Sequence, residues 1–225
     1  MERTSSLFPR LVGAAGAAWG AYTRHEFVRL LASGDLPEAC FRRYLTQDYL
    51  FLIHFARAWG LAIYKSDTLA EMRRAQRLVA ATLDVEIGLH IDYCRGWGLS
   101  EAAMAAEPEA PATIAYTRFV LDRGVAGDRL DLEVSLAPCI IGYAVIGAER
   151  MADPGTQLDG NRYREWLDMY AGDDYQNLAG EAKAALDDQF ARRGGEGRFA
   201  SLAANFSLAS RLEAEFWQMG LDAKR

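Results

Sequence analysis

The sequence predicts an all-α protein that folds as one domain over residues 1–225. Only six prolines occur, and most lie outside the long stretches of periodic apolar residues, so long helices can form without interruption. Segment 37–64 shows the 3.6-residue period of a helix face in its apolar residues Phe41, Leu45, Leu52 and Trp59. Hydrophobic residues make up 51% of the chain, which is enough for one sizeable core.

The pattern predicts eight helices, at about 6–32, 37–64, 68–96, 112–123, 128–137, 163–170, 174–191 and 198–219. The first is expected to end at Gly34, because glycine suits the left-handed conformation that follows many helices. Segment 128–137 also alternates apolar and polar residues as a strand does. We interpret it as a helix, because its neighbours are helical and one lone strand could not pair.

Charge and cysteine content exclude several classes of function. The net charge is -6, the sequence pI is about 5.2 and no basic run occurs, so we expect no nucleic-acid partner. The three cysteines, Cys40, Cys94 and Cys139, show no CxxC spacing, which argues against a disulfide framework or zinc site and favours a reducing, cytoplasmic location. The Ala/Gly-rich run 11–21 is weakly hydrophobic, so we interpret it as helix, and we expect no membrane-spanning segment.

One stretch, 136–147, carries a candidate nucleophile. Cys139 follows Pro138, and Tyr143 comes four residues later, which would place thiol and phenol on one helix face. Pro138 could begin a helix or kink one, and either would leave backbone N–H groups near Cys139 that favour a thiolate. The alternative is that Cys139 is simply a small buried hydrophobe.

Two acidic residues fall on apolar helix faces. Asp48 lies four residues from both Tyr44 and Leu52, and Glu213 lies on the stripe of the last helix. A buried carboxylate is costly unless it is paired, so each is either a structural acid or part of a pocket. Glu86 and His90, at i and i+4, could share a metal, but only three histidines exist and we favour a surface or interhelix hydrogen bond.

Several segments spread along the chain carry a specific set of motifs. They are Thr23-Arg-His-Glu-Phe-Val28 with Gly34-Asp-Leu-Pro37, Phe41-Arg-Arg-Tyr-Leu-Thr-Gln-Asp-Tyr49, Pro111-Ala-Thr-Ile-Ala-Tyr116, Pro138-Cys139 with Tyr143, Tyr163 with Trp166 and Tyr170, and Glu213 with Phe216-Trp217. In order and spacing, this set resembles the TenA/thiaminase II family over nearly the whole chain.

The resemblance implies a haem-oxygenase-like helical domain, a homotetramer, no metal or other cofactor, and a small-molecule aminopyrimidine substrate from thiamin metabolism. It implies that Cys139 is the nucleophile, that Glu213 is the acid/base, and that Asp48 hydrogen-bonds the amino edge of the ring. Tyr116, Tyr143 and Tyr170 would line the pocket. Phe51 is a departure, because the family often has an aromatic hydroxyl there, and this puts the preferred substrate in question.

Two alternatives of other classes stay open. A non-catalytic, pyrimidine-binding or regulatory member of the family would keep the pocket without hydrolysis. A metal-dependent oxidase on the same scaffold would need several histidine and carboxylate ligands facing one point, which the histidine count disfavours.

Overall fold

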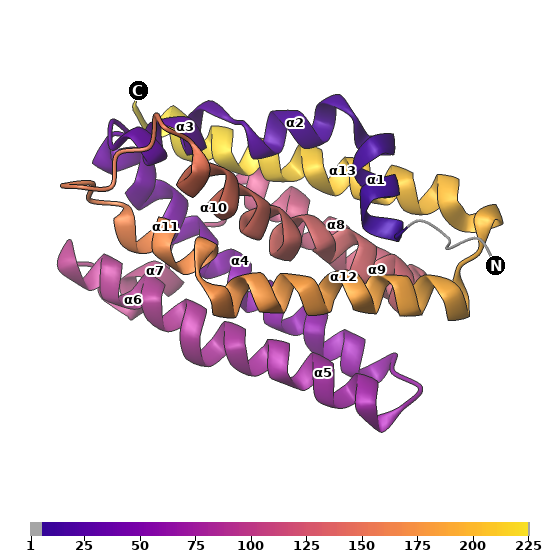
Figure 1. Ribbon diagram of the computed structural model, residues 1–225. Helices are drawn as coiled ribbons and strands as arrows, with labels where there is room; N and C mark the ends of the chain where they lie inside the picture. Colours follow the sequence, from indigo (N-terminus) through magenta and orange to yellow (C-terminus); the bar gives the residue numbers. More distant parts are fainter. Residues whose placement is uncertain (1–5, 225) are drawn as a thin grey trace. The chain divides into compact units, whose positions relative to one another are not determined.

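The computed structural model describes residues 6–224, and every regular element among them is a helix (Figure 1). This confirms the all-α class. The chain divides into two compact units, one made of the residues up to Leu36 with Glu133–Trp217, the other of Pro37–Leu132 with the residues from Gln218 onward. The single domain expected over residues 1–225 stays a prediction.

The first unit contains three short N-terminal helices and most of the C-terminal half. Its elements are α1 (Leu7–Ala15), α2 (Ala17–Thr23), α3 (Glu26–Ser33), the π-helix η2 (Pro138–Gly142), α10 (Tyr143–Ala152), α11 (Arg164–Ala171) and α12 (Asp173–Arg193), with most of α9 (Arg129–Ala137) and of α13 (Glu196–Leu221). Helix α12 packs against α1 and η2, and α10 packs against α11. These contacts surround the segment that carries Cys139.

The second unit is built on the long helix α4 (Glu38–Tyr64), which packs against α5, α6 and α8. Figure 1 shows α5 and α6 following one another along one rod. The elements are α5 (Leu69–Ala80), the π-helix η1 (Ala81–Glu86), α6 (Ile87–Gly96), α7 (Glu101–Ala105), α8 (Pro111–Ala126) and the 3₁₀ turn η3 (Asp222–Lys224). The central position of α4 explains why most of its residues around Asp48 are buried.

The single helix predicted over 6–32 is wrong, because this stretch forms α1, α2 and α3. Gly16 adopts φ +50°, which interrupts the first run. A second break falls at His25, whose backbone is extended and whose Nδ1 accepts a hydrogen bond from the N–H of Phe27 at 3.1 Å, so that it caps α3. Gly34 follows α3 with φ +78°, as predicted.

The helix predicted over 68–96 is helical throughout but not uniformly α-helical. A capping box between Thr68 and Glu71 starts α5, and the π-helical turn η1 separates α5 from α6. The short helix α7 was not predicted from the sequence. Helix α9 confirms that segment 128–137 is helical.

A continuous helical run from Arg129 to Ala152 contradicts the expectation that no segment is long and apolar enough to cross a membrane. Its best 18-residue window has a mean hydropathy of 1.5, but 83% of that window is buried inside the protein. Among the described residues, this is the one helix that is long and apolar enough to cross a membrane. Its burial is that of a core helix.

Candidate functional site

Cys139 lies in the π-helical turn η2 and is partly exposed, whereas Cys40 and Cys94 are buried. Pro138 does not begin a helix, because Ala137 before it is already helical. Of the two alternatives left open for Pro138, a helix start and a kink, the structure therefore excludes the helix start. Pro138 instead widens a continuous helix, since it lacks the N–H that the regular α-helical ladder needs.

Tyr22 of α2 contacts the π-helical turn η2. Its hydroxyl donates a hydrogen bond to the carbonyl oxygen of Pro138 at 3.1 Å. Its ring lies against Gly142, where a Cβ atom would come within 2.4 Å of the ring carbon Cε1. Glycine at this position therefore permits a close approach between α2 and the turn that carries Cys139.

Tyr143 lies within a buried aromatic cluster of the first unit. Its ring centroid is 4.8 Å from that of Tyr170, 5.3 Å from Trp217 and 5.9 Å from Trp166. The rings are tilted rather than parallel, an arrangement that aromatic quadrupoles favour. The structure thus brings together Tyr143 and Tyr170, two of the tyrosines predicted from the sequence to line a site.

The position of Tyr170 depends on two neighbours that the sequence did not single out. At Gly147 of α10, a Cβ atom would lie 2.5 Å from the carbonyl carbon of Tyr170, so only glycine permits this approach. The amide Nε2 of Gln176 donates to the carbonyl oxygens of Tyr170 at 2.8 Å and of Ala144 at 2.9 Å. These contacts fix the end of α11 against α10.

Glu213 lies on α13 in the same unit as Cys139, Tyr143 and Tyr170. Its side chain is 2% exposed, as its place on the apolar stripe predicted. A carboxyl group at this depth must be compensated by hydrogen bonds or by a proton of its own.

Asp48 lies in the second unit and is also buried. Its Oδ2 atom accepts a hydrogen bond from the hydroxyl of Tyr44 at 3.1 Å and lies 2.7 Å from Nε2 of His90. His90 comes from α6, so this contact is an interhelix hydrogen bond, one of the two kinds that the sequence favoured over a metal site. Among residues 6–224 no group of three or more His, Cys, Asp or Glu side chains is arranged to hold a metal ion.

The imidazole of His90 is fully enclosed. Its Nδ1 lies 2.7 Å from the backbone carbonyl oxygen of Glu86, one turn earlier. Burial lowers the pKa of His90, but the hydrogen bond to Asp48, its charge and that of Glu86 outweigh burial and raise the pKa above its usual value. A long-range partner for His90 could not be identified from sequence spacing.

Tyr116 and Phe51 form a second aromatic contact in this unit. Their ring centroids are 5.0 Å apart and both side chains are buried. The approach to α8, which carries Tyr116, is anchored by Gln47: its Oε1 accepts from the N–H of Ala110 at 2.8 Å and from the hydroxyl of Thr113 at 2.7 Å. The neighbouring residues Gln47 and Asp48 of α4 thus contact different helices. Gln47 hydrogen-bonds the start of α8, and Asp48 hydrogen-bonds His90 of α6.

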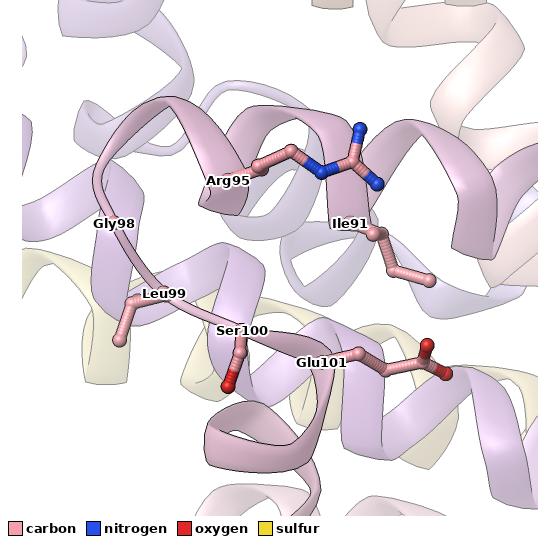
Figure 2. Close-up of a pocket in the computed structure, with 6 residues that line it drawn as sticks. All are labelled: Ile91, Arg95, Gly98, Leu99, Ser100 and Glu101. Atoms are coloured by element: carbon pink, nitrogen blue, oxygen red, sulfur yellow. The ribbon is translucent and has the colours of Figure 1, made fainter.

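A surface pocket of about 350 Å³ opens between the end of α6 and α7 (Figure 2). It is lined by Ile91, Arg95, Gly98, Leu99, Ser100 and Glu101. None of the site residues predicted from the sequence lines it. Glu101 accepts a hydrogen bond from the hydroxyl of Tyr49 at 3.2 Å, which ties this surface to α4.

Comparison with known proteins identifies relatives along the full chain. An aminopyrimidine aminohydrolase from Halalkalibacterium halodurans is 35% identical over 224 residues, covering 100% of this chain and 97% of that protein. A protein from Haemophilus influenzae is 39% identical over 219 residues, covering 96% of this chain and 99% of the relative. The crystal structure of a TenA family transcription regulator from Silicibacter sp. TM1040 has a TM-score of 0.90 at 45% identity, covering 96% of each chain.

The family model described as TENA/THI-4/PQQC matches residues 14–223. The match includes every site residue predicted from the sequence, from Asp48 to Glu213. Because this model spans nearly the whole chain and full-length relatives exceed 30% identity, the protein belongs to the TENA/THI-4/PQQC family.

Proposed function

We propose that this protein is a hydrolase of the thiaminase II type that converts aminopyrimidines to 4-amino-5-hydroxymethyl-2-methylpyrimidine in thiamin salvage. The substrate is thiamin or its breakdown product 4-amino-5-aminomethyl-2-methylpyrimidine. The observation that carries the proposal is the 35% identity, over the full chain, to a relative named aminopyrimidine aminohydrolase. Cytoplasmic location and a homotetramer belong to the same proposal.

The proposed reaction begins with Cys139. Its thiolate adds to an electron-poor ring carbon of the pyrimidine, and a ring nitrogen takes up a proton. The electron pair then expels the group on the exocyclic methylene, which leaves with a proton as ammonia from the aminomethyl substrate or, from thiamin, as the neutral thiazole without a proton. Water adds to the resulting exocyclic double bond, and loss of the thiolate restores the aromatic ring.

In this mechanism Glu213 delivers and removes the ring-nitrogen protons, which is general acid–base work. Asp48 accepts a hydrogen bond from the amino group of the ring. Tyr116, Tyr143, Tyr170 and Phe51 supply flat surfaces for the pyrimidine. The burial of both acids and the partial exposure of Cys139 support this division of roles, because a nucleophile must be reachable while the acids gain from a dry environment.

Exposed apolar side chains on the second unit support self-association. Leu69, Leu83 and Val85, on α5 and η1, are 59%, 48% and 66% exposed. Burying such exposed side chains between subunits would favour association. Sedimentation velocity of the purified protein tests the tetramer directly, and a monomer at micromolar concentration would contradict it.

The decisive experiment measures hydrolysis of the aminomethylpyrimidine and of thiamin by wild type, Cys139→Ser and Cys94→Ala. We expect Cys139→Ser to fold normally and to lose at least about a thousandfold in kcat/KM, as happens when a nucleophile is removed. Cys94→Ala is the matched control and should keep its activity. Full activity in Cys139→Ser would exclude the cysteine mechanism.

A regulatory role is the second candidate, because the Silicibacter relative at 45% identity is described as a transcription regulator. The net charge of -6 and the absence of a basic run argue against direct DNA binding. Calorimetric binding of the aminopyrimidine by wild type, with no turnover of either substrate, would favour this candidate over hydrolysis.

A further inference from the structure

We propose that His90 is a positioning residue for Asp48: by donating to Oδ2, it orients the carboxyl group and leaves Oδ1 to accept from the amino group of the substrate. The inference rests on the proposed function, since it extends the role given there to Asp48. Asp48, Glu86 and His90 all lie in the second unit, on α4, η1 and α6.

The contact of Nδ1 shows where one proton of His90 lies. Nδ1 lies 2.7 Å from the carbonyl oxygen of Glu86. A backbone carbonyl can only accept a hydrogen bond, so Nδ1 must carry a hydrogen. The second ring nitrogen, Nε2, faces Asp48. It either carries a second proton and donates it, or accepts a proton from the carboxylic acid.

Nε2 of His90 lies 2.7 Å from Oδ2 of Asp48. One proton must lie between these atoms, because two bare lone pairs would repel each other. The side chains of His90 and Asp48 are 1% and 6% exposed, so the contact lies in the protein interior. Burial lowers the pKa of His90, but Asp48 and Glu86 raise it more; together with Nδ1 donating to a carbonyl oxygen, this favours Nε2 as the donor to Oδ2.

The two carboxylate oxygens of Asp48 have different surroundings. Tyr44, one turn before Asp48 on α4, also donates to Oδ2, at 3.1 Å. Both donors therefore hold the same oxygen. Among the described residues no hydrogen bond is made to Oδ1 of Asp48. A carboxylate with one oxygen doubly held and the other open is suited to accept one amino group in a fixed direction.

A purely structural pair would show different behaviour. Loss of such a pair would lower the free energy of unfolding but would not raise KM selectively over its effect on kcat. The proton of the pair could lie on either partner. A positioning role requires the imidazolium form and a selective effect on substrate binding. These two readouts are independent of each other.

The first readout is the ¹⁵N NMR spectrum of histidine side chains in the free protein near pH 7. Only His25, His54 and His90 are present, so spectra of His54→Gln and His90→Gln assign the resonances. We expect both ring nitrogens of His90 to be protonated. An unprotonated Nε2 would overturn the proposal, because Asp48 would then hold the proton and act as the donor.

The second readout is steady-state kinetics. We expect His90→Leu to raise KM about tenfold or more while kcat changes less than about threefold, since a charge-assisted hydrogen bond that orients a binding group is lost. His90→Gln, whose amide can still donate to Oδ2, should keep KM near the wild-type value. His54→Leu is the matched control for loss of a histidine, and its KM should not change.

A double variant separates this inference from the proposed function. If His90 acts through Asp48, His90→Leu with Asp48→Asn should have the same KM as Asp48→Asn alone. An active wild type whose KM is unchanged by His90→Leu would overturn the positioning role only. A wild type that hydrolyses no aminopyrimidine would overturn the proposed function, while the NMR spectrum would still report the proton on His90.

Discussion

The hydroxyl of Tyr22 donates a hydrogen bond to the carbonyl oxygen of Pro138, which lies 116 residues further along the chain. This carbonyl belongs to the π-helical turn that carries Cys139. π-Helical turns are uncommon and recur at functional sites, where they redirect a side chain. The contact therefore links the N-terminal helices to the geometry of the proposed nucleophile.

Tyr22→Phe removes this hydrogen bond and keeps the ring. The buried carbonyl of Pro138 then loses a donor, so we expect the free energy of unfolding to fall by about 1 kcal/mol. Urea denaturation measures the change. Because the turn around Cys139 loses a support, kcat should fall as well. A variant with wild-type stability and activity would show that the π-helical turn holds without Tyr22.

Gly147→Ala is expected to be strongly destabilising, by about 2 kcal/mol or more, because the added Cβ atom would lie 2.5 Å from the backbone of Tyr170. The backbone of α11 would have to move, and the Tyr143–Tyr170 contact with it. Thermal unfolding checks the prediction. Gly180→Ala is the matched control: nothing lies within 4 Å of its Cβ position on α12, so helix propensity should make it slightly more stable.

Gln47→Leu leaves the N–H of Ala110 and the hydroxyl of Thr113 without their acceptor. Each buried group that loses its partner costs about 1–3 kcal/mol, so we expect a loss of stability in that range or above it. Since these groups anchor the start of α8, Tyr116 should also be displaced and KM should rise. Gln218→Leu, which removes an exposed amide hydrogen bond to Asp222, should change stability little. Equal effects of the two variants would contradict this view of Gln47.

Stability at alkaline pH should depend on Cys94. Burial raises the pKa of its thiol from 9.0 to about 11. The unfolded chain therefore loses this proton first, and the stabilisation by the buried neutral thiol is complete below pH 9 and is lost as the pH rises towards 11. Denaturation at a series of pH values should show a shallower decline for Cys94→Ala. An identical slope in both proteins would contradict this cause.

Local sequence determined the fold class and the burial of individual residues. The 3.6-residue period predicted α4 over almost its full length, and it placed Asp48 and Glu213 on buried faces. Gly34 marked the end of α3, because the left-handed conformation there is easy only for glycine. These features depend on residues within a few turns of one another, so a pattern in one dimension contains them.

Only the tertiary structure decided which distant residues meet. The pairing of Asp48 with His90 joins residues 42 apart, and the hydrogen bond from Tyr22 to Pro138 joins residues 116 apart. No periodicity records such a contact, because its free energy comes from burial and exact geometry after the helices have packed. The interruption of the N-terminal helix at Gly16 and the widening of the helix at Pro138 were likewise hidden. The turn at Pro138 receives its hydrogen bond from Tyr22 of a distant helix, so it depends on packing that no local pattern contains.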